Sequence, residues 1–204
     1  MAVPFTVLSN ALKPFTGLIA GRPVLATFQV NLRCNSACRY CDLPLNVGRY
    51  EMTREEIQRV FSSLYRDGVR FVLLQGGEPL LRRDLAEILE DLSAIGFHLT
   101  LITNGTKVTA QFVERLGRLP VAISVSLDTL DREKYRQIRG ADQLEQVLEG
   151  MAQLKNFPHP KFLTCIVSEV NRAEVPAVVR FASEQGFLPV VGACHWNVGV
   201  YGRP

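Results

Sequence analysis

The sequence VLATFQVNLRCNSACRYC, residues 24–41, joins a mostly apolar segment to a loop that carries three cysteines. The apolar part, residues 24–30, is compatible with β structure and predicts a buried strand that ends just before the loop. Cys34, Cys38 and Cys41 are separated by three and then two residues, so a short loop is able to turn all three thiols toward one point. Thiolates are soft ligands that suit iron–sulfur clusters or zinc. The stretch therefore predicts a metal site at the end of a strand.

The number of cysteines in this loop limits the kind of metal site. A closed structural zinc site or an electron-transfer cluster takes four protein ligands, and the sequence has no fourth cysteine nearby. Three thiolates on a four-iron cluster leave one iron open to a ligand that is not part of the protein. The alternative is a set of core cysteines, since free cysteine is often buried, but core cysteines have no reason to cluster at this spacing in a polar loop.

Composition sets the outer limits of the interpretation. At 204 residues the chain is long enough for one domain with a sizeable core, and its 47% hydrophobic content is that of a soluble globular protein. No apolar run approaches the ~20 residues that a membrane span requires, and the start at Met1 lacks the charged segment of a secretory signal. Five cysteines, three of them clustered, argue for a reducing compartment, so we expect a cytoplasmic protein. The net charge of +3 forms no basic stripe for nucleic acid.

A helix is expected after the cysteine loop, over residues 53–67. Thr53 and Glu56 have the spacing of a capping box, and Gly68 ends the apolar pattern. The expected apolar stripe of this helix consists of Ile57, Val60, Phe61 and Leu64. The segment therefore predicts the first helix of a strand–helix unit.

The alternation of strands and helices continues along the chain. A second helix is expected with Asp84 and Glu87 as its cap and Gly96 at its end. Residues 129–140 are long and charged and are expected to form a connection. The other expected strands are residues 70–74, 98–103, 121–125, 162–167 and 188–191, and the other expected helices are residues 110–116, 144–151 and about 173–185.

Strands that alternate with helices predict a parallel sheet with right-handed crossovers. A closed barrel of eight units uses about 31 residues per unit, so this chain holds about six units. We therefore expect an α/β fold, a partial (β/α)6 barrel that resembles an incomplete TIM barrel. A doubly wound open sheet is the alternative, but the G-x-G-x-x-G turn is absent after the first strand. Residues 1–23 are expected to form an N-terminal extension and residues 24–204 the core domain.

The cysteine loop, with Tyr40 before its third cysteine, resembles the CxxxCxxC signature of the radical S-adenosylmethionine (SAM) enzymes. A second motif of that family, GGEP, is matched downstream at the end of the next apolar segment by Gly76, Gly77, Glu78 and Pro79. The resemblance implies the partial barrel, a [4Fe-4S] cluster held by the three cysteines, and SAM at the open iron. It also implies reductive cleavage of SAM to a 5′-deoxyadenosyl radical that takes hydrogen from a substrate, either a peptide or a precursor of a cofactor or metabolite.

Polar residues follow the expected strands at the ends where such a site lies. By resemblance, the GGEP motif binds the amino group of SAM, where Glu78 supplies charge opposite an ammonium group. Ser126 and Asp128, after the fourth strand, are implied to hold the ribose, while Asn104 and Asn171 are further candidates for contact with SAM. Each of the last three has a structural alternative: Asn104 in a turn, Asp128 as the cap of a short helix, and Asn171 in a turn or at a helix start.

Other readings of the cysteine loop and of the chain's end remain open. An iron–sulfur electron-transfer or metal-binding module without SAM chemistry needs a fourth ligand, and Cys194 and His195 are the evident candidates. An inactive scaffold is a third alternative. The resemblance implies an electron donor such as flavodoxin or ferredoxin as a partner. Many related enzymes carry a C-terminal extension with auxiliary clusters, so this chain is either a minimal enzyme or a fragment. The apolar Trp196, Val198 and Val200 near its end favour a truncated core domain. Cys165 is expected in the core.

Overall fold

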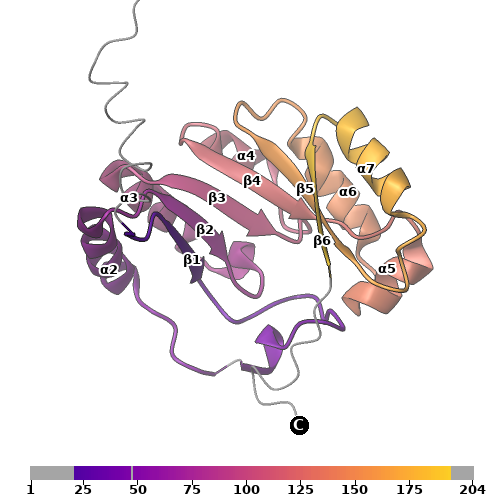
Figure 1. The fold of residues 1–204 in the computed structure, drawn as a ribbon, viewed down its shortest axis with the longest axis horizontal. Helices are drawn as coiled ribbons and strands as arrows, with labels where there is room; N and C mark the ends of the chain where they lie inside the picture. The colour runs from indigo at the N-terminus through magenta and orange to yellow at the C-terminus, as the bar shows by residue number, and fades with distance from the viewer. Residues whose placement is uncertain (1–20, 47, 194–204) are drawn as a thin grey trace, which may run out of the picture.

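The structure, a computed structural model, describes residues 21–46 and 48–193 as six parallel strands that alternate with helices (Figure 1). The strands are β1 (Leu25–Gln29), β2 (Phe71–Gln75), β3 (His98–Thr103), β4 (Val121–Ser126), β5 (Lys161–Val167) and β6 (Leu188–Ala193). The helices are α2 (Arg54–Asp67), α3 (Leu85–Ile95), α4 (Ala110–Leu116), α5 (Arg132–Arg139), α6 (Leu144–Gln153) and α7 (Val175–Glu184), with short 3-10 helices η1 (Leu43–Asn46) and η2 (Pro79–Leu81).

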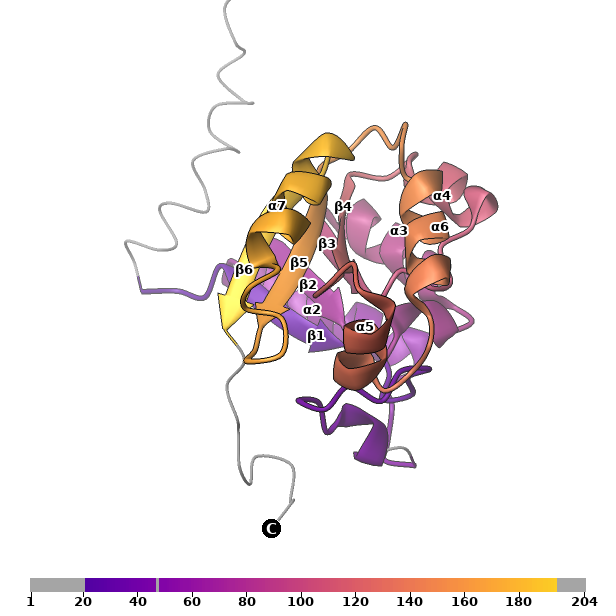
Figure 2. The same ribbon diagram turned by 90° about the vertical axis from the view of Figure 1, so that its right-hand side faces the viewer.

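The strands pair in sequence order, from β1 to β6, in one curved sheet. Among the described residues β1 and β6 do not pair with each other, so the barrel is open. This arrangement confirms the expected partial (β/α)6 barrel and excludes a doubly wound sheet, in which the strand order would reverse. All pairs are parallel, so the carboxyl ends of the strands gather at one edge of the sheet, where the cysteine loop also lies (Figures 1 and 2).

The strands form because each is a short, largely apolar run, and in β2 and β3 alternate side chains are buried in the core. Their most buried side chains include Val72, Leu74, Leu101, Ile123, Val125 and Leu163, all at most 1% exposed. Helices α2, α3, α6 and α7 add apolar stripes to the same core. One hydrophobic core therefore holds the strand ends in a fixed relative position.

Helix α2 shows how its own sequence defines it. The Thr53 hydroxyl accepts a hydrogen bond from the Glu56 backbone N–H at 3.3 Å, and the Glu56 carboxylate accepts one from the Thr53 N–H at 2.8 Å. Gly68 ends the helix with a φ of 116°, in the left-handed region. The capping box and the stop are confirmed. Val60, expected in the apolar stripe, is instead 44% exposed, because the buried face is centred on Ile57 and Phe61.

Two local expectations are wrong. Asp84 stands at the start of α3 but makes no capping hydrogen bond, because its carboxylate pairs with the guanidinium of Arg82 at 2.8 Å. Residues 129–140 are more than a connection, since they contain helix α5. Asp131, rather than Asp128, caps α5 by accepting a hydrogen bond from the Lys134 N–H at 2.9 Å.

Several expectations concern residues outside the described part of the chain. Most of the expected N-terminal extension, residues 1–20, lies outside the described residues, and so do Cys194 and His195. The domain boundary at residues 23 and 24 and the truncation of the core domain stay predictions. Within the described residues, no helix is both long enough and apolar enough to cross a membrane.

Candidate functional site

A cavity of about 310 Å³ lies at the carboxyl edge of the sheet. It is lined by the cysteine loop and by residues at the ends of β2, β3, β4 and β5 and of α5. The lining residues of chemical interest are Cys34, Cys38, Tyr40, Cys41, Gly76, Gly77, Thr103, Asn104, Ser126 and Arg139. The structure therefore brings the three cysteines together with Tyr40, both glycines of the GGEP motif, Asn104 and Ser126, as the sequence predicted.

Backbone hydrogen bonds fix the cysteine loop to the end of α5. The N–H groups of Ala37 and Arg39 donate to the carbonyls of Arg139 and Ile138, at 2.9 and 3.0 Å. The last carbonyls of a helix have no partner within the helix, so the loop satisfies them. Cys38 lies between these two anchor points, and its position is therefore tied to α5.

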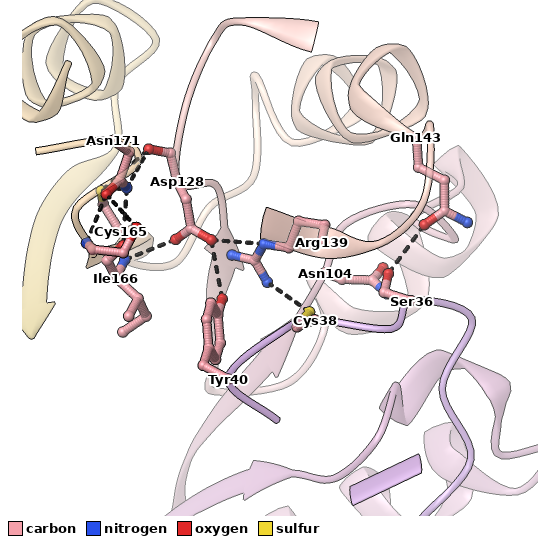
Figure 3. A network of polar contacts seen from close by, with 11 residues as sticks. Ser36, Cys38, Tyr40, Asn104, Asp128, Arg139, Gln143, Cys165, Ile166 and Asn171 are labelled. Carbon is pink, nitrogen blue, oxygen red and sulfur yellow. Dashed lines mark hydrogen bonds and ion pairs between the residues drawn. The ribbon is translucent and has the colours of Figure 1, made fainter. Parts of the chain in front are cut away.

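Side-chain hydrogen bonds fix the same loop to the end of β3 and to the start of α6. Asn104 donates to the side-chain oxygen of Asn35 at 2.8 Å, and Asn35 in turn donates to the hydroxyl of Thr106, also at 2.8 Å. The Ser36 hydroxyl donates to Gln143 at 3.0 Å (Figure 3). Asn104 thus acts both as a wall of the cavity and as a support for the cysteine loop.

The thiols suit a four-iron cluster better than a single metal ion. All three are partly buried and line the same cavity, and burial is the main cause that raises the pKa of Cys34 and of Cys41 above the ordinary value of 9.0. Among the described residues, no three His, Cys, Asp or Glu side chains lie close enough for one ion. A cluster holds its thiolates further apart than an ion does, and the described cavity walls include no fourth cysteine or histidine. The donor set therefore matches a cluster with one open iron.

The two glycines are required by the close packing of the protein against itself. A Cβ on Gly76 would lie 2.5 Å from the Asn31 carbonyl oxygen, and one on Gly77 would lie 2.1 Å from the Arg33 carbonyl oxygen. The Gly77 N–H donates to the Asn31 carbonyl at 3.0 Å, which locks the loop after β2 onto the segment that precedes the cysteines. Both glycines also line the cavity, so their backbone is open to a ligand on the other side.

The Glu78 carboxylate is enclosed by the protein. The side chain is fully buried and accepts hydrogen bonds from the Thr103 hydroxyl at 2.6 Å, the Asn104 N–H at 2.7 Å and the Leu80 N–H at 3.0 Å. Burial outweighs these bonds and raises the pKa of Glu78. In this structure the carboxylate holds the end of β3, and the expectation that Glu78 places its charge opposite an ammonium group stays a prediction. Pro79 is also buried and begins η2.

Asp128 and Asn171 are fully buried as well, and both support their neighbours (Figure 3). Asp128 accepts hydrogen bonds from the Tyr40 hydroxyl at 3.0 Å and from the Ile166 N–H at 2.8 Å. Asn171 donates to the carbonyls of Asp128 and Ile166 at 2.8 and 2.9 Å. Both side chains support their neighbours in the fold, and their expected contacts with SAM stay predictions. Cys165 is buried beside them, as expected.

Arg139 is a site residue that the sequence did not reveal. It is only 5% exposed, yet it lines the cavity, and its Nε lies 2.8 Å from the Asp128 carboxylate. Its Nη1 lies 3.9 Å from the Cys38 sulfur, and its Nη2 has no hydrogen-bond partner among the described residues. Burial works to lower the pKa of Arg139, but the Asp128 carboxylate offsets this and the pKa stays above its ordinary value. The sequence signal that could have indicated the helix is a cation in its last turn followed by Gly140.

Solved structures with bound SAM share this fold. The chain is similar to Streptococcus suis SuiB bound to S-adenosylmethionine, with a TM-score of 0.80 and 19% identity over 98% of this chain and 48% of that one. It is also similar to anSMEcpe with bound AdoMet, with a TM-score of 0.72 and 22% identity over 89% of this chain and 52% of that one. At this level of identity the likeness shows the fold alone.

Curated relatives found by sequence are more similar to this chain in sequence than these solved structures are. The chain is 37% identical over 169 residues to the probable GTP 3′,8-cyclase of Pyrococcus horikoshii, which covers 80% of this chain and 54% of the relative. It is 36% identical over 165 residues to the GTP 3′,8-cyclase of Brucella abortus, which covers 76% of this chain and 47% of the relative. The chain thus spans about half the length of the curated relatives it matches. The profile of the Radical SAM superfamily matches residues 29–182. This chain belongs to the radical SAM superfamily, whose members use a [4Fe-4S] cluster and SAM.

Proposed function

We propose that this chain is the core of a radical SAM enzyme that cleaves SAM reductively and uses the resulting radical to take a hydrogen atom from its substrate. The observation that carries the proposal is the cavity in which Cys34, Cys38 and Cys41 stand without a fourth thiol or imidazole among the described residues. A closed electron-transfer site would need that fourth ligand. When bound, the cluster and SAM together supply the 5′-deoxyadenosyl radical.

The chain's own residues would hold the cluster, orient SAM and form the walls of its cavity. The three thiolates hold the cluster, and the backbone of Gly76 and Gly77 faces the cavity where the amino group of SAM would lie. Arg139 offers an unpartnered Nη2, which suits the carboxylate of SAM, because a buried guanidinium pairs strongly with a carboxylate. The apolar ring of Tyr40 forms part of one wall, held by the bond between its hydroxyl and Asp128.

Polar groups on the remaining walls would contact the ribose and other parts of SAM. Ser126, at the end of β4, and Asn104, which follows β3, both line the cavity. Direct contacts of Glu78, Asp128 and Asn171 with SAM stay predictions, since none of the three lines the cavity. Each fixes a residue of the cavity wall: Glu78 holds Asn104, and Asp128, supported by Asn171, holds both Tyr40 and Arg139.

The substrate and the electron donor are proposed from chemistry and from the relatives. The substrate is a small molecule or a peptide, and the curated relatives named as GTP 3′,8-cyclases favour a small molecule. Reduction of the cluster needs a low-potential one-electron donor such as flavodoxin or ferredoxin. We place the enzyme in the cytoplasm, because its described cysteines are free thiols and a reducing compartment keeps them so.

Electron paramagnetic resonance on the anaerobically reconstituted and reduced chain tests this function, with and without SAM. We expect a four-iron signal that changes when SAM is added. Cys38→Ala is expected to abolish the signal, while Cys165→Ala is expected to keep it, because Cys165 is buried away from the cavity. A signal that is indifferent to SAM would favour an electron-transfer module, and a reconstituted chain that takes up no iron would refute the proposal.

A further inference from the structure

Helix α5 brings two hydrogen-bond donors to the protein side of the cysteine loop. Arg139 Nη1 lies 3.9 Å from the Cys38 sulfur (Figure 3). Tyr135 is fully buried, and its hydroxyl has no hydrogen-bond partner among the described residues. The two residues are four positions apart in one helix, so they lie on the same helix face. One face of α5 therefore holds a guanidinium and a phenol that are both directed to the interior.

The position of this face relative to the cysteines is fixed by backbone contacts. Ala37 and Arg39, on either side of Cys38, donate to the last carbonyls of α5. Gly140, which ends the helix, lets the loop approach so closely that a Cβ there would lie 2.4 Å from the Ala37 carbonyl oxygen. These contacts fix the cysteine loop against the end of α5 and so hold Arg139 next to the Cys38 sulfur.

The Tyr135 hydroxyl is buried one helical turn before Arg139 and remains a donor. Burial raises its pKa to about 12, and negative charge on Cys38 and Cys34 works in the same direction, while Arg139 works against it. The phenol thus keeps its proton at neutral pH. A buried hydroxyl that makes no hydrogen bond costs free energy, and a sulfur atom of a cluster is an acceptor that would satisfy it.

We propose that α5 sets the reduction potential of the cluster through these two donors. Arg139 N–H would donate to the Cys38 thiolate that holds the cluster, and Tyr135 O–H would add a second donor from the same helix face. Both would stabilise the reduced form, which carries one more negative charge. Asp128, 2.8 Å from Arg139, balances much of the guanidinium charge, so directed hydrogen bonds rather than net charge are the main effect. The inference rests on the cluster assigned under the proposed function.

Potentiometry of the reconstituted chain without SAM, followed by electron paramagnetic resonance, tests this inference. Tyr135→Phe removes only the hydroxyl, and we expect its cluster to be harder to reduce by about tenfold, which is 59 mV for a one-electron couple. Its iron content is expected to equal that of the wild type. Tyr65→Phe is the matched control, since Tyr65 lies on α2 and stacks against Arg70, and no change in potential is expected.

A second pair of variants tests the other donor, Arg139, so that the inference can still be tested if Tyr135→Phe does not fold. Arg139→Lys retains the charge but replaces the planar guanidinium with a single ammonium group, and Arg132→Lys makes the same change at an exposed position of the same helix. A lower potential for Arg139→Lys and an unchanged one for Arg132→Lys are expected. If Tyr135→Phe and Arg139→Lys both load iron and keep the wild-type potential, the inference is overturned while the proposed function stands. A wild type without a cluster would overturn both.

Discussion

The carboxylate of Glu78 joins the GGEP loop to the end of β3 through three hydrogen bonds. Replacing it by an amide in Glu78→Gln leaves two of the three donors an oxygen to bind but places an N–H group against another donor. A buried donor without its acceptor costs about 1–3 kcal/mol, so we expect the free energy of unfolding of the cluster-free chain to fall by about that amount in urea. Glu184→Gln, on an exposed position of α7, is the control and should change little. Equal stability of the two variants would contradict the role given to Glu78.

The stability difference between the wild type and Glu78→Gln is also expected to depend on pH. Because burial raises the pKa of Glu78 above its ordinary value of 4.5, the folded state holds the proton more tightly than the unfolded state. The stability linked to this proton is fully present below pH 4.5 and is lost as the pH rises through the folded pKa. The excess stability of the wild type over Glu78→Gln is therefore expected to decrease as the pH rises above 4.5. Urea unfolding at several pH values measures it, and an increasing difference would show that the pKa is lowered instead.

At the scale of elements, the contact between the end of α5 and the cysteine loop depends on Gly140. Its φ is +66°, and a Cβ there would meet the Ala37 carbonyl oxygen at 2.4 Å. Gly186 has a similar φ of +74°, but the nearest atom to its Cβ would be the Lys161 ammonium at 3.7 Å. Alanine at either position would cost about 1–2 kcal/mol because of the positive φ. Only at Gly140 would its Cβ also clash with backbone.

Gly140→Ala is therefore expected to lose more stability than Gly186→Ala and to take up less iron, because the clash displaces the loop that carries Cys38. Urea unfolding of the cluster-free chains gives the first quantity, and iron and sulfide analysis after reconstitution gives the second. Gly186→Ala should load a full cluster. Equal iron content in the two variants would show that the loop does not need its contact with α5.

Most elements could be predicted because each has a local cause. The strands are short apolar runs bounded by polar loops, and α2 begins at Thr53 and ends at Gly68 for reasons confined to a few residues. Helix α5 escaped prediction because only Tyr135, Ile138 and Arg139 of its residues are buried, and one of these is charged. Its stability comes in part from the cysteine loop, and a contact so distant in the sequence leaves no local pattern.

At the scale of the whole molecule, the parallel sheet decides which residues form the site. Register brings Gln29 beside Gln75 and Ser126 beside Thr164, so the loops that follow these strands meet at one edge. The order of elements was therefore enough to gather the cysteines, the glycines, Asn104 and Ser126. The sequence could not predict where individual side chains point, since this depends on packing. Glu78 and Asp128 are buried in the protein, while Arg139 lines the cavity from α5, a helix that was not predicted.

The docking of the cysteine loop on α5 has a consequence for the timing of maturation. Cys38 and Arg139 are 101 positions apart in the sequence, so the loop meets α5 only after four strands and α5 have been synthesised. A ribosome-bound chain that stops before α5 contains all three thiols but lacks the backbone contacts that Ala37 and Arg39 make on either side of Cys38. Full iron uptake is therefore expected only from chains that include α5.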